Sequence, residues 1–356
     1  MSVVKHPAAY ITPQLFNTIR TYAAEGEQLQ QLHPMQLQII HQEKWFNLFV
    51  PKEFNGLGLS LPEGLQKEEA LAYTDGSLGW TVTLCAGAAW FIGFLKPELV
   101  QLIFSNKKAC LAGSGQANGS AYKTKNRYLV NGKWDYATGA PFATAFTANC
   151  VLFEHDKPLL DKVGNPLIQS FLFLKNEITI VKNWKRIGMI ATGSNGFSVA
   201  EVQVPENRTF IIDGKEATLS DPIFQYPFMA LAQTTLAVNS SGMAMRFLDI
   251  CKEDLSADKY KLLQQKLLIA YAEMDTSRQL FFEAVATSWK QCIEQKLTAE
   301  TLHIIGELSK QLAHKSLKIT DELYPYCGMN AANPSTELNR VWRNMHTASQ
   351  HSIFNV

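Results

Sequence analysis

The sequence predicts an α+β protein with an N-terminal helical domain, a small central antiparallel β-sandwich or barrel, and a C-terminal four-helix bundle. Residues 1–108 carry helix signals separated by turns, and residues 109–215 carry short β-type runs bounded by Gly, Asn, Asp or Pro. Residues 216–356 become helical again, with no Gly or Pro between Met243 and Ile305. A chain of 356 residues is long enough for several domains, so we place the domain boundaries at these changes of pattern.

Local signals predict where the N-terminal helices begin. Ser60 to Glu63 has the capping-box form with a proline inside the first turn, so we expect a helix from there to about Tyr73. Pro97 opens another helix, which runs through Phe104. Gly76–Leu95 is a stretch of twenty residues without a charge. We interpret it as a helix buried inside the helical domain, with a membrane span as the alternative.

The strongest local signal in the central domain is Asn131-Gly132, which stands between Tyr128–Val130 and Lys133–Tyr136. Both residues tolerate positive φ, so the pattern predicts a two-residue type I′ hairpin. Several strands at this spacing without intervening helices are typical of a small antiparallel sandwich or barrel. We expect that domain to close near Pro205 to Asp213.

A single apolar stripe runs along the predicted bundle. Its members recur at spacings of mostly three and four residues: Tyr260, Leu263, Leu267, Tyr271, Met274, Phe281, Val285, Trp289 and Cys292. Arg278 lies on the same stripe, where the pattern requires an apolar side chain, so its charge needs a partner. A buried carboxylate, a snorkelling position at a bundle end, and the anionic group of a cofactor held between bundle and sheet remain open as explanations.

Charge and cysteine content exclude several classes of protein. Lys and Arg total 33 against 32 Asp and Glu, a formal net charge of +1, so no overall field attracts nucleic acid or an anionic membrane. The six cysteines are scattered without a C-x-x-C pair and indicate a reduced, cytoplasmic protein, and no signal peptide is visible. His346 and His351 are five residues apart, which does not fit an i, i+4 pair of metal ligands, so we expect no metal site.

Helical domain, β domain and bundle form an uncommon order, and five stretches of the chain match one family in that order. They are LFVPKEFNGLGLSLPEGLQKEEALAYTDGSLGW, YLVNGKWDYATGA, RIGMIATGSNGFSVAEVQVP, AYAEMDTSRQLFFEA and ELNRVWRNMHTASQH. With these stretches the chain resembles the acyl-CoA dehydrogenase superfamily over nearly its whole length. The resemblance implies that family's fold and a bound flavin, FAD first and FMN as the second choice.

The resemblance also implies which residues hold the flavin. Tyr136-Ala137-Thr138 occupies the place of a family element that lies against the isoalloxazine, so Thr138 is expected near N5 and Tyr136 beside the ring. Arg278 matches the family arginine that binds the FAD diphosphate, often across a subunit boundary. Gly328 resembles a glycine turn at the cofactor's adenosine end. An ordinary strand end and an ordinary turn glycine are the alternatives for Thr138 and Gly328.

The catalytic base of acyl-CoA dehydrogenases is missing from this chain. Those enzymes remove a proton with a glutamate, but the two matching places carry His351-Ser352 and Phe228–Leu231. The stretch Trp342–His351 instead resembles the C-terminal helix of flavin-dependent monooxygenases on the same fold, where a histidine matching His351 lies beside flavin C4a. On a helical wheel His351 falls opposite the apolar stripe, so a solvated side chain is the alternative. A second histidine of many such hydroxylases is matched here by Ala88.

These resemblances imply a monooxygenase that receives reduced flavin from a separate reductase and acts on a small substrate, with aromatic compounds as one class. His351 would be the catalytic residue, supporting oxygen addition and exchanging a proton with substrate. An acyl-CoA dehydrogenase or oxidase and a non-catalytic flavin-binding relative are the alternative functions. The family assembles through its bundle helices, which predicts a homotetramer or homodimer.

Overall fold

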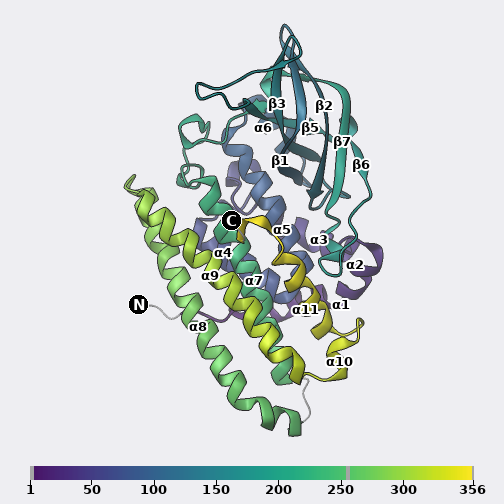
Figure 1. The fold of residues 1–356 in the computed structure, drawn as a ribbon, viewed down its shortest axis with the longest axis vertical. Coiled ribbons are helices and arrows are strands. Elements are labelled where there is room, and N and C mark those ends of the chain that lie inside the picture. The colour runs from purple at the N-terminus through teal and green to yellow at the C-terminus, as the bar shows by residue number, and fades with distance from the viewer. Residues whose placement is uncertain (1–3, 254–256, 355–356) are drawn as a thin grey trace.

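The computed structural model describes residues 4–253 and 257–354. A β-sheet stands at one end of an elongated molecule, and helices fill the rest (Figure 1). The chain builds helices, then strands, then helices again, which confirms the predicted α+β fold class. One hydrophobic core runs through all of these segments. The division into domains at residues 108 and 215 therefore stays a prediction.

The N-terminal segment is helical as expected, and two of its helices begin where the local signals predict. They are α1 (Pro13–Thr21), α2 (Ala23–Leu29), α3 (Pro34–Gln42), α4 (Leu61–Thr74), α5 (Gly76–Ala89) and α6 (Pro97–Phe104). At the start of α4, the Glu63 carboxylate accepts hydrogen bonds from the backbone N–H and the hydroxyl of Ser60, at 2.9 and 2.6 Å. The capping box thus holds the first turn, and the predicted helices α4 and α6 are confirmed.

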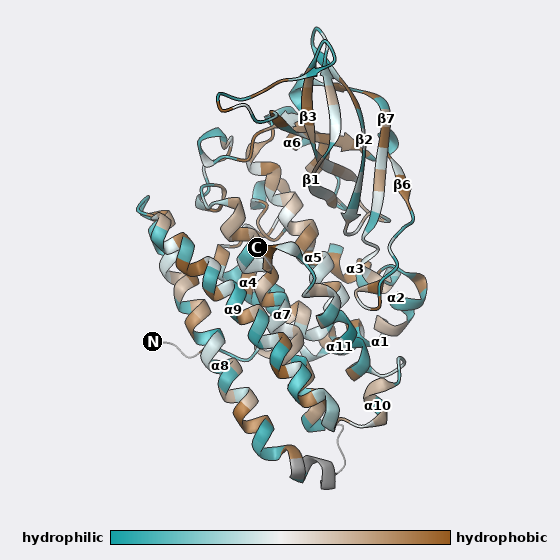
Figure 2. Ribbon diagram, viewed as in Figure 1, coloured by the Kyte–Doolittle hydropathy of each residue, from teal (hydrophilic) through white to brown (hydrophobic). Residues whose placement is uncertain are grey.

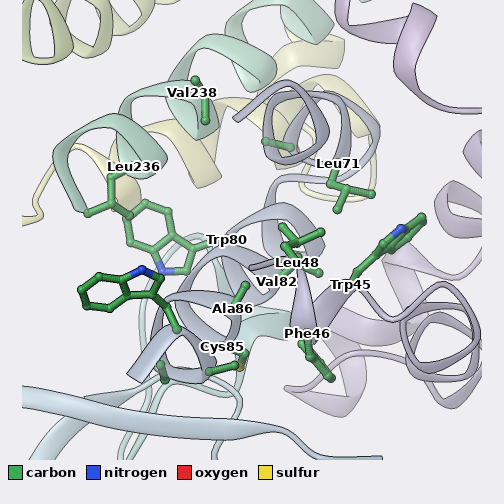
Figure 3. Close-up of a cluster of buried hydrophobic side chains, with 14 of the residues drawn as sticks. Trp45, Phe46, Leu48, Leu71, Trp80, Val82, Cys85, Ala86, Leu236 and Val238 are labelled. Atoms are coloured by element: carbon green, nitrogen blue, oxygen red, sulfur yellow. The ribbon is translucent and has the colours of Figure 1, made fainter. Parts of the chain in front are cut away.

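Helix α5 is the central helix of this segment and continues into a 3₁₀ turn, Trp90–Phe94. The stretch Gly76–Phe94 is long and apolar enough to cross a membrane, but 83% of its most hydrophobic window is buried inside the protein. Figure 3 shows its side chains Trp80, Cys85 and Ala86 in a cluster with Leu236 from α7 (Phe228–Glu253). The stretch therefore packs as a core helix, as expected.

The strands form one mixed sheet rather than a wholly antiparallel one. They are β1 (Leu111–Lys123), β2 (Arg127–Ala137), β3 (Ala145–Glu154), β4 (Lys157–Pro158), β5 (Ile168–Leu174), β6 (Thr179–Val181), β7 (Asn195–Pro205) and β8 (Thr209–Phe210). Their order is β6-β7-β2-β1-β3-β5-β8, with β4 paired to β3. Strand β2 pairs with β1 on one edge and with β7 on the other, so β3 cannot pair with β2. Strand β3 pairs instead with the free edge of β1, and these two strands are parallel.

The hairpin predicted at Asn131-Gly132 is wrong, because β2 runs straight through both residues. The strand pairs with β1 on one side and β7 on the other, so two ladders outweigh the local turn preference. The Asn131 side chain instead accepts a hydrogen bond from the backbone N–H of Glu201 at 2.8 Å, where the β7 register shifts. Glu201 has φ of 52°, so the pair marks a bulge between β2 and β7.

The C-terminal helices are α7, α8 (Ala257–Ile293), α9 (Ala299–Leu323), α10 (Met329–Ala332) and α11 (Glu337–Ala348). Helix α7 packs against α8, α9 and α11, which forms the expected bundle. Hydrophilic and hydrophobic residues alternate along α8 and α9 (Figure 2). The predicted stripe is buried at Leu263, Leu267, Met274, Phe281, Val285 and Cys292. Tyr260 lies outside the described side chains.

Glu68 on α4 is a fully buried carboxyl group in this helical core. Neither of its oxygens has a hydrogen-bond partner among the described residues. Burial raises the pKa of Glu68 well above its usual value, and the nearby Thr83 hydroxyl offsets this only in part. That hydroxyl accepts a hydrogen bond from the Asn239 amide at 2.8 Å. Burial therefore favours the neutral form of Glu68 in the folded protein.

Glu68→Gln should stabilise the protein increasingly as pH rises. The pKa of Glu68 is higher in the folded protein than in the unfolded chain. The wild-type protein is therefore most stable at pH values below the unfolded-state pKa, and it loses stability as the pH rises toward the folded-state pKa. The variant should gain about 1 kcal/mol or more at pH 8 and little at pH 4.5, measured by urea unfolding. The exposed Glu53→Gln should show no such trend. An unchanged pH dependence in Glu68→Gln would contradict the neutral acid.

Candidate functional site

A chain of three buried hydroxyl groups lies where β2 ends. Thr138 follows β2 directly, and its hydroxyl oxygen lies 2.8 Å from that of Ser194, which precedes β7. The Ser194 oxygen lies 2.7 Å from the Thr192 hydroxyl, and Thr192 donates to the Met189 carbonyl, also at 2.7 Å. All three side chains are buried, with Thr138 the most accessible at 5% exposure. The chain therefore joins the expected N5 contact, Thr138, to the loop 184–194.

Tyr136 lies beside this chain with its side chain 53% exposed. It has φ of 66°, a backbone conformation that is uncommon for a bulky residue. The edge of its ring meets Trp184 at 6.3 Å between centroids, and the Arg186 guanidinium lies 5.8 Å from the Tyr136 ring. The Trp184 indole donates to the Met189 carbonyl at 2.8 Å. An exposed aromatic residue and a buried hydroxyl thus lie at the same strand end.

Helix α11 fixes the loop that carries the hydroxyl chain. The Asn344 side chain accepts a hydrogen bond from the Met189 backbone N–H at 2.6 Å, and the Thr347 hydroxyl accepts from Gly188 at 3.0 Å. A side chain at Gly188 would place its Cβ 2.0 Å from the Arg343 carbonyl oxygen, so only glycine allows this approach. The loop and the helix are therefore in backbone contact.

His351 lies just beyond α11, which ends at Ala348. Its ring meets Trp80 of α5 edge to face, with centroids 5.9 Å apart, and its Nδ1 accepts a hydrogen bond from Ile353 at 3.3 Å. Burial lowers the pKa of His351, so the imidazole is neutral near pH 7. The solvated-side-chain alternative is wrong, because His351 itself is half-buried and its ring packs on Trp80. The helical wheel did not apply to His351 because the helix had already ended.

Helix α5 connects the two candidate groups. The Cys85 thiol donates to the backbone carbonyl of Thr138 at 3.6 Å, while Trp80 on the same helix contacts His351. His351 and Thr138 therefore both border α5. The side chains that form this border, Trp80 and Cys85, are 8% and 0% exposed. The helix thus supplies a rigid base for both candidate groups.

One face of α5 and its 3₁₀ extension remains partly open. Trp80, Leu84, Gly87 and Phe91 recur at helical spacing on that face, and the last three are half-buried. A Cβ added to Gly87 would meet nothing within 4 Å, so there is open space beside it. Phe91 extends this face with aromatic contacts to Phe210 and Phe228, each at 5.4 Å between centroids. Ala88, which the resemblance matches to a histidine of many such hydroxylases, is buried.

Arg278 is fully enclosed in the bundle and has a carboxylate partner. Its Nε and one Nη atom donate to the two oxygens of Glu69 at 2.8 and 2.9 Å, and the same Nη reaches the Lys5 carbonyl. The Arg278 side chain is 1% exposed, and Asp275 lies 3.6 Å away. The buried-carboxylate explanation is therefore the one observed. Glu69 is the partner that the charge on the apolar stripe requires, so the guanidinium of Arg278 is occupied within this chain and is not free for a phosphate group.

Gly328 precedes the short helix α10 with φ of 74°, a conformation that favours glycine. Helix α10 lies at the end of the molecule away from the sheet that carries Thr138 (Figure 1). Gly328 and Thr138 therefore lie in different parts of the described chain. The sequence did not single out Thr192, Ser194 or Trp184, because hydroxyl and aromatic residues in a loop carry no distinctive spacing.

Comparison with known proteins supports the fold. Residues 226–356 match the family described as acyl-CoA dehydrogenase, C-terminal domain. Indole-3-acetate monooxygenase of Acinetobacter baumannii is 25% identical over 355 residues, covering 95% of this chain and 89% of that protein. The flavin-dependent monooxygenase oxygenase subunit HsaA of Mycobacterium tuberculosis is 24% identical over 369 residues, covering 95% of this chain and 89% of that protein.

Solved structures give the same result. The crystal structure of HsaA superposes with a TM-score of 0.88 at 21% identity, covering 97% of this chain and 92% of that one. XiaF from Streptomyces, solved with FADH2 and glycerol, superposes with a TM-score of 0.85 at 20% identity and covers 96% of this chain and 91% of that one. The resemblance to the acyl-CoA dehydrogenase superfamily, on its monooxygenase side, is confirmed.

Arg278→Ala should unfold more easily rather than lose only a flavin contact. Removing the guanidinium leaves the buried Glu69 carboxylate unpaired, which costs about 3–5 kcal/mol of unfolding free energy, measured in urea. The double variant Arg278→Met with Glu69→Leu should recover most of the loss, because no buried charge remains. A stable Arg278→Ala protein with selectively weakened flavin binding would instead restore the phosphate role.

Proposed function

We propose that this chain, which has the acyl-CoA dehydrogenase fold, is the oxygenase component of a flavin-dependent monooxygenase. It would take reduced flavin from a separate reductase and hydroxylate a small aromatic compound. The observation that carries the proposal is the contact of both Thr138 and His351 with α5, with the exposed Tyr136 at the same strand end as Thr138. The names of its relatives, monooxygenases and an oxygenase subunit, support the reaction class and the reductase partner. The proposal includes a cytoplasmic location, in keeping with six buried cysteines.

The residues at the end of β2 fit a flavin. Thr138 would hold the ring at N5 through its hydroxyl oxygen, and Tyr136 would lie beside the ring with its exposed aromatic face. Bound reduced flavin supplies the reaction with dioxygen, from which one oxygen atom enters the product and the other leaves as water. We propose FAD as the flavin, since FADH2 is bound in XiaF, with FMN as the second choice. Gly328 would contact the adenosine end only of a flavin shared with another copy of the chain.

His351 would exchange a proton with the substrate. The neutral imidazole can accept a proton from a phenol or similar group, and contact with Trp80 holds its ring in place. The half-open face that begins at Trp80 and ends at Phe91 presents apolar and aromatic side chains. Such a face suits a flat aromatic substrate, which buries its rings by offset or edge contacts.

A dehydrogenase acting on acyl-CoA thioesters is the second candidate function. Its reaction needs a carboxylate base beside the flavin, and Ser352 and residues 228–231 supply none at the matching places. Adding an acyl-CoA to the flavin-loaded protein without oxygen separates the two functions. Bleaching of the oxidised flavin would support the dehydrogenase, whereas no bleaching is expected of the monooxygenase. A protein that binds no flavin, oxidised or reduced, would contradict both.

His351→Ala should impair the oxidative reaction and leave flavin binding nearly unchanged. Loss of a general acid or base costs about 10²–10⁴ in rate, so hydroxylated product should fall and hydrogen peroxide should rise per reduced flavin consumed. In the parent, burial lowers the His351 pKa, so the proton-accepting form persists down to below about pH 6.5. Product yield in the parent should therefore fall at pH values below the His351 pKa, where the imidazole is protonated. This fall at low pH should be absent in the variant.

His346→Ala is the matched control for His351→Ala. The His346 ring bonds Asp321 at 2.8 Å and packs on Trp342, so it lies on the other side of α11 from the proposed site. Product yield should remain near the parental value in this variant. Equal yields in all three proteins would remove His351 from the reaction.

Self-association forms a separate part of the proposal. Helix α8 exposes large apolar side chains that this chain does not cover: Leu268, Ile269, Leu280 and Ile293. A second copy would bury them, so sedimentation at micromolar concentration should show two or four times the 39.8 kDa of one chain. Leu268→Glu with Leu280→Glu should shift the equilibrium toward monomers. A parent protein that sediments only as a monomer would contradict the proposed oligomer.

A further inference from the structure

The direction of the hydrogen bonds in the Thr138 chain is fixed at one end. The Met189 carbonyl oxygen can only accept, so the 2.7 Å contact with the Thr192 hydroxyl requires the Thr192 proton. Reversing this contact would bring two oxygen atoms to 2.7 Å with no proton between them, which is repulsive. Thr192 therefore has no proton left for Ser194 and accepts one from it.

The remaining protons follow in order. Ser194 donates its only hydroxyl proton to Thr192 at 2.7 Å. Its oxygen must therefore accept the hydrogen bond in the 2.8 Å contact with Thr138. Thr138 therefore donates its own proton to Ser194. Its backbone groups are also used, since the N–H donates to the Tyr136 carbonyl and the carbonyl accepts from Cys85. The Thr138 hydroxyl oxygen can therefore accept a hydrogen bond from a ligand, but Thr138 has no proton left to donate to one.

The Met189 carbonyl that sets this direction is itself held in place. It accepts a second hydrogen bond from the Trp184 indole at 2.8 Å. The N–H of the same residue donates to Asn344 on α11 at 2.6 Å. Because both the N–H and the carbonyl of Met189 have partners, the residue cannot turn its carbonyl away from Thr192 without breaking the bond to Trp184. The acceptor state of Thr138 is therefore built into the loop before any ligand arrives.

We propose that this hydroxyl chain makes the site selective for the oxidation state of the flavin. The proposal rests on the proposed function, in which Thr138 lies at flavin N5. Reduced flavin carries a hydrogen on N5 and can donate to the Thr138 oxygen. Oxidised flavin presents a lone pair at N5, which meets an acceptor oxygen whose proton is already committed to Ser194. Ser194 and Thr192 are thus positioning residues that favour arrival of reduced flavin and departure of oxidised flavin.

The test is a pair of dissociation constants measured without oxygen, one for oxidised FAD and one for reduced FAD. The parent should bind reduced FAD more tightly. In Ser194→Ala the Thr138 proton becomes free to meet oxidised N5, and in Thr192→Val the freed Ser194 proton can satisfy Thr138 instead. Each variant should therefore lower the ratio of the oxidised to the reduced dissociation constant by about three- to tenfold, the effect of one hydrogen bond.

The same change appears in the reduction potential of the bound flavin. A tenfold fall in the ratio lowers the two-electron midpoint potential by about 30 mV, which redox titration against a reference dye resolves. Thr144→Val is the matched control, because the Thr144 hydroxyl bonds only the Cys110 backbone among the described residues and lies outside the chain. Its ratio and potential should equal those of the parent.

The outcomes separate this inference from the proposed function. A folding defect weakens both oxidation states equally and leaves their ratio intact, so the ratio reports the proton direction alone. If the parent binds flavin but Ser194→Ala and Thr192→Val keep its ratio, the hydroxyl chain does not select the oxidation state, and the proposed function still stands. If the parent binds neither flavin, the proposed function itself fails.

Discussion

The contact between α11 and the loop 184–194 is the constraint on which the rest of the site depends. Asn344 and Thr347 hold two consecutive backbone N–H groups, and Arg343 donates to the Ile187 carbonyl at 2.6 Å. These bonds fix a short stretch of loop on a helix more than 150 residues away in the sequence. Since Met189 then orients Thr192, the direction of every proton up to Thr138 follows from this contact. A substitution on α11 that weakens this contact would therefore change the hydrogen bonds of Thr138, although these α11 side chains bond to the loop rather than to Thr138 itself.

The same helix also places His351. Arg343 pairs with Glu27 at 2.8 Å, and Arg340 lies 3.9 Å from Asp75, the residue that caps the start of α5. Helix α11 is thus tied to α2, to α5 and to the sheet loop at once, and the chain leaves it directly into His351. Helix α5 in turn carries Trp80 against the imidazole. Burying charged groups has a desolvation cost, which these ion pairs offset while they join α11 to α2 and α5.

Local chemistry explains which parts of the fold could be predicted. The capping box at Ser60 and the prolines that begin helices act within one turn, so their effects can be read from neighbouring residues. Asn131-Gly132 has an equally strong local preference, yet two flanking strands override it, and that information lies near residues 120 and 200. The apolar stripe predicts that the charge of Arg278 needs a partner. Its partner Glu69, 209 residues away, could be identified only from the structure.

The site shows the same division between local and distant information. Thr138, Tyr136 and His351 were found through a family resemblance, and the structure then brought Thr138 and His351 to one helix. The helical wheel misplaced His351 because periodicity holds only while the helix continues, and α11 ends three residues earlier. The direction of the hydrogen bonds in the hydroxyl chain could not be predicted from the sequence for a further reason. Its direction is set by a backbone carbonyl, which every residue at position 189 would provide, so no side-chain pattern could reveal that Thr138 presents an acceptor.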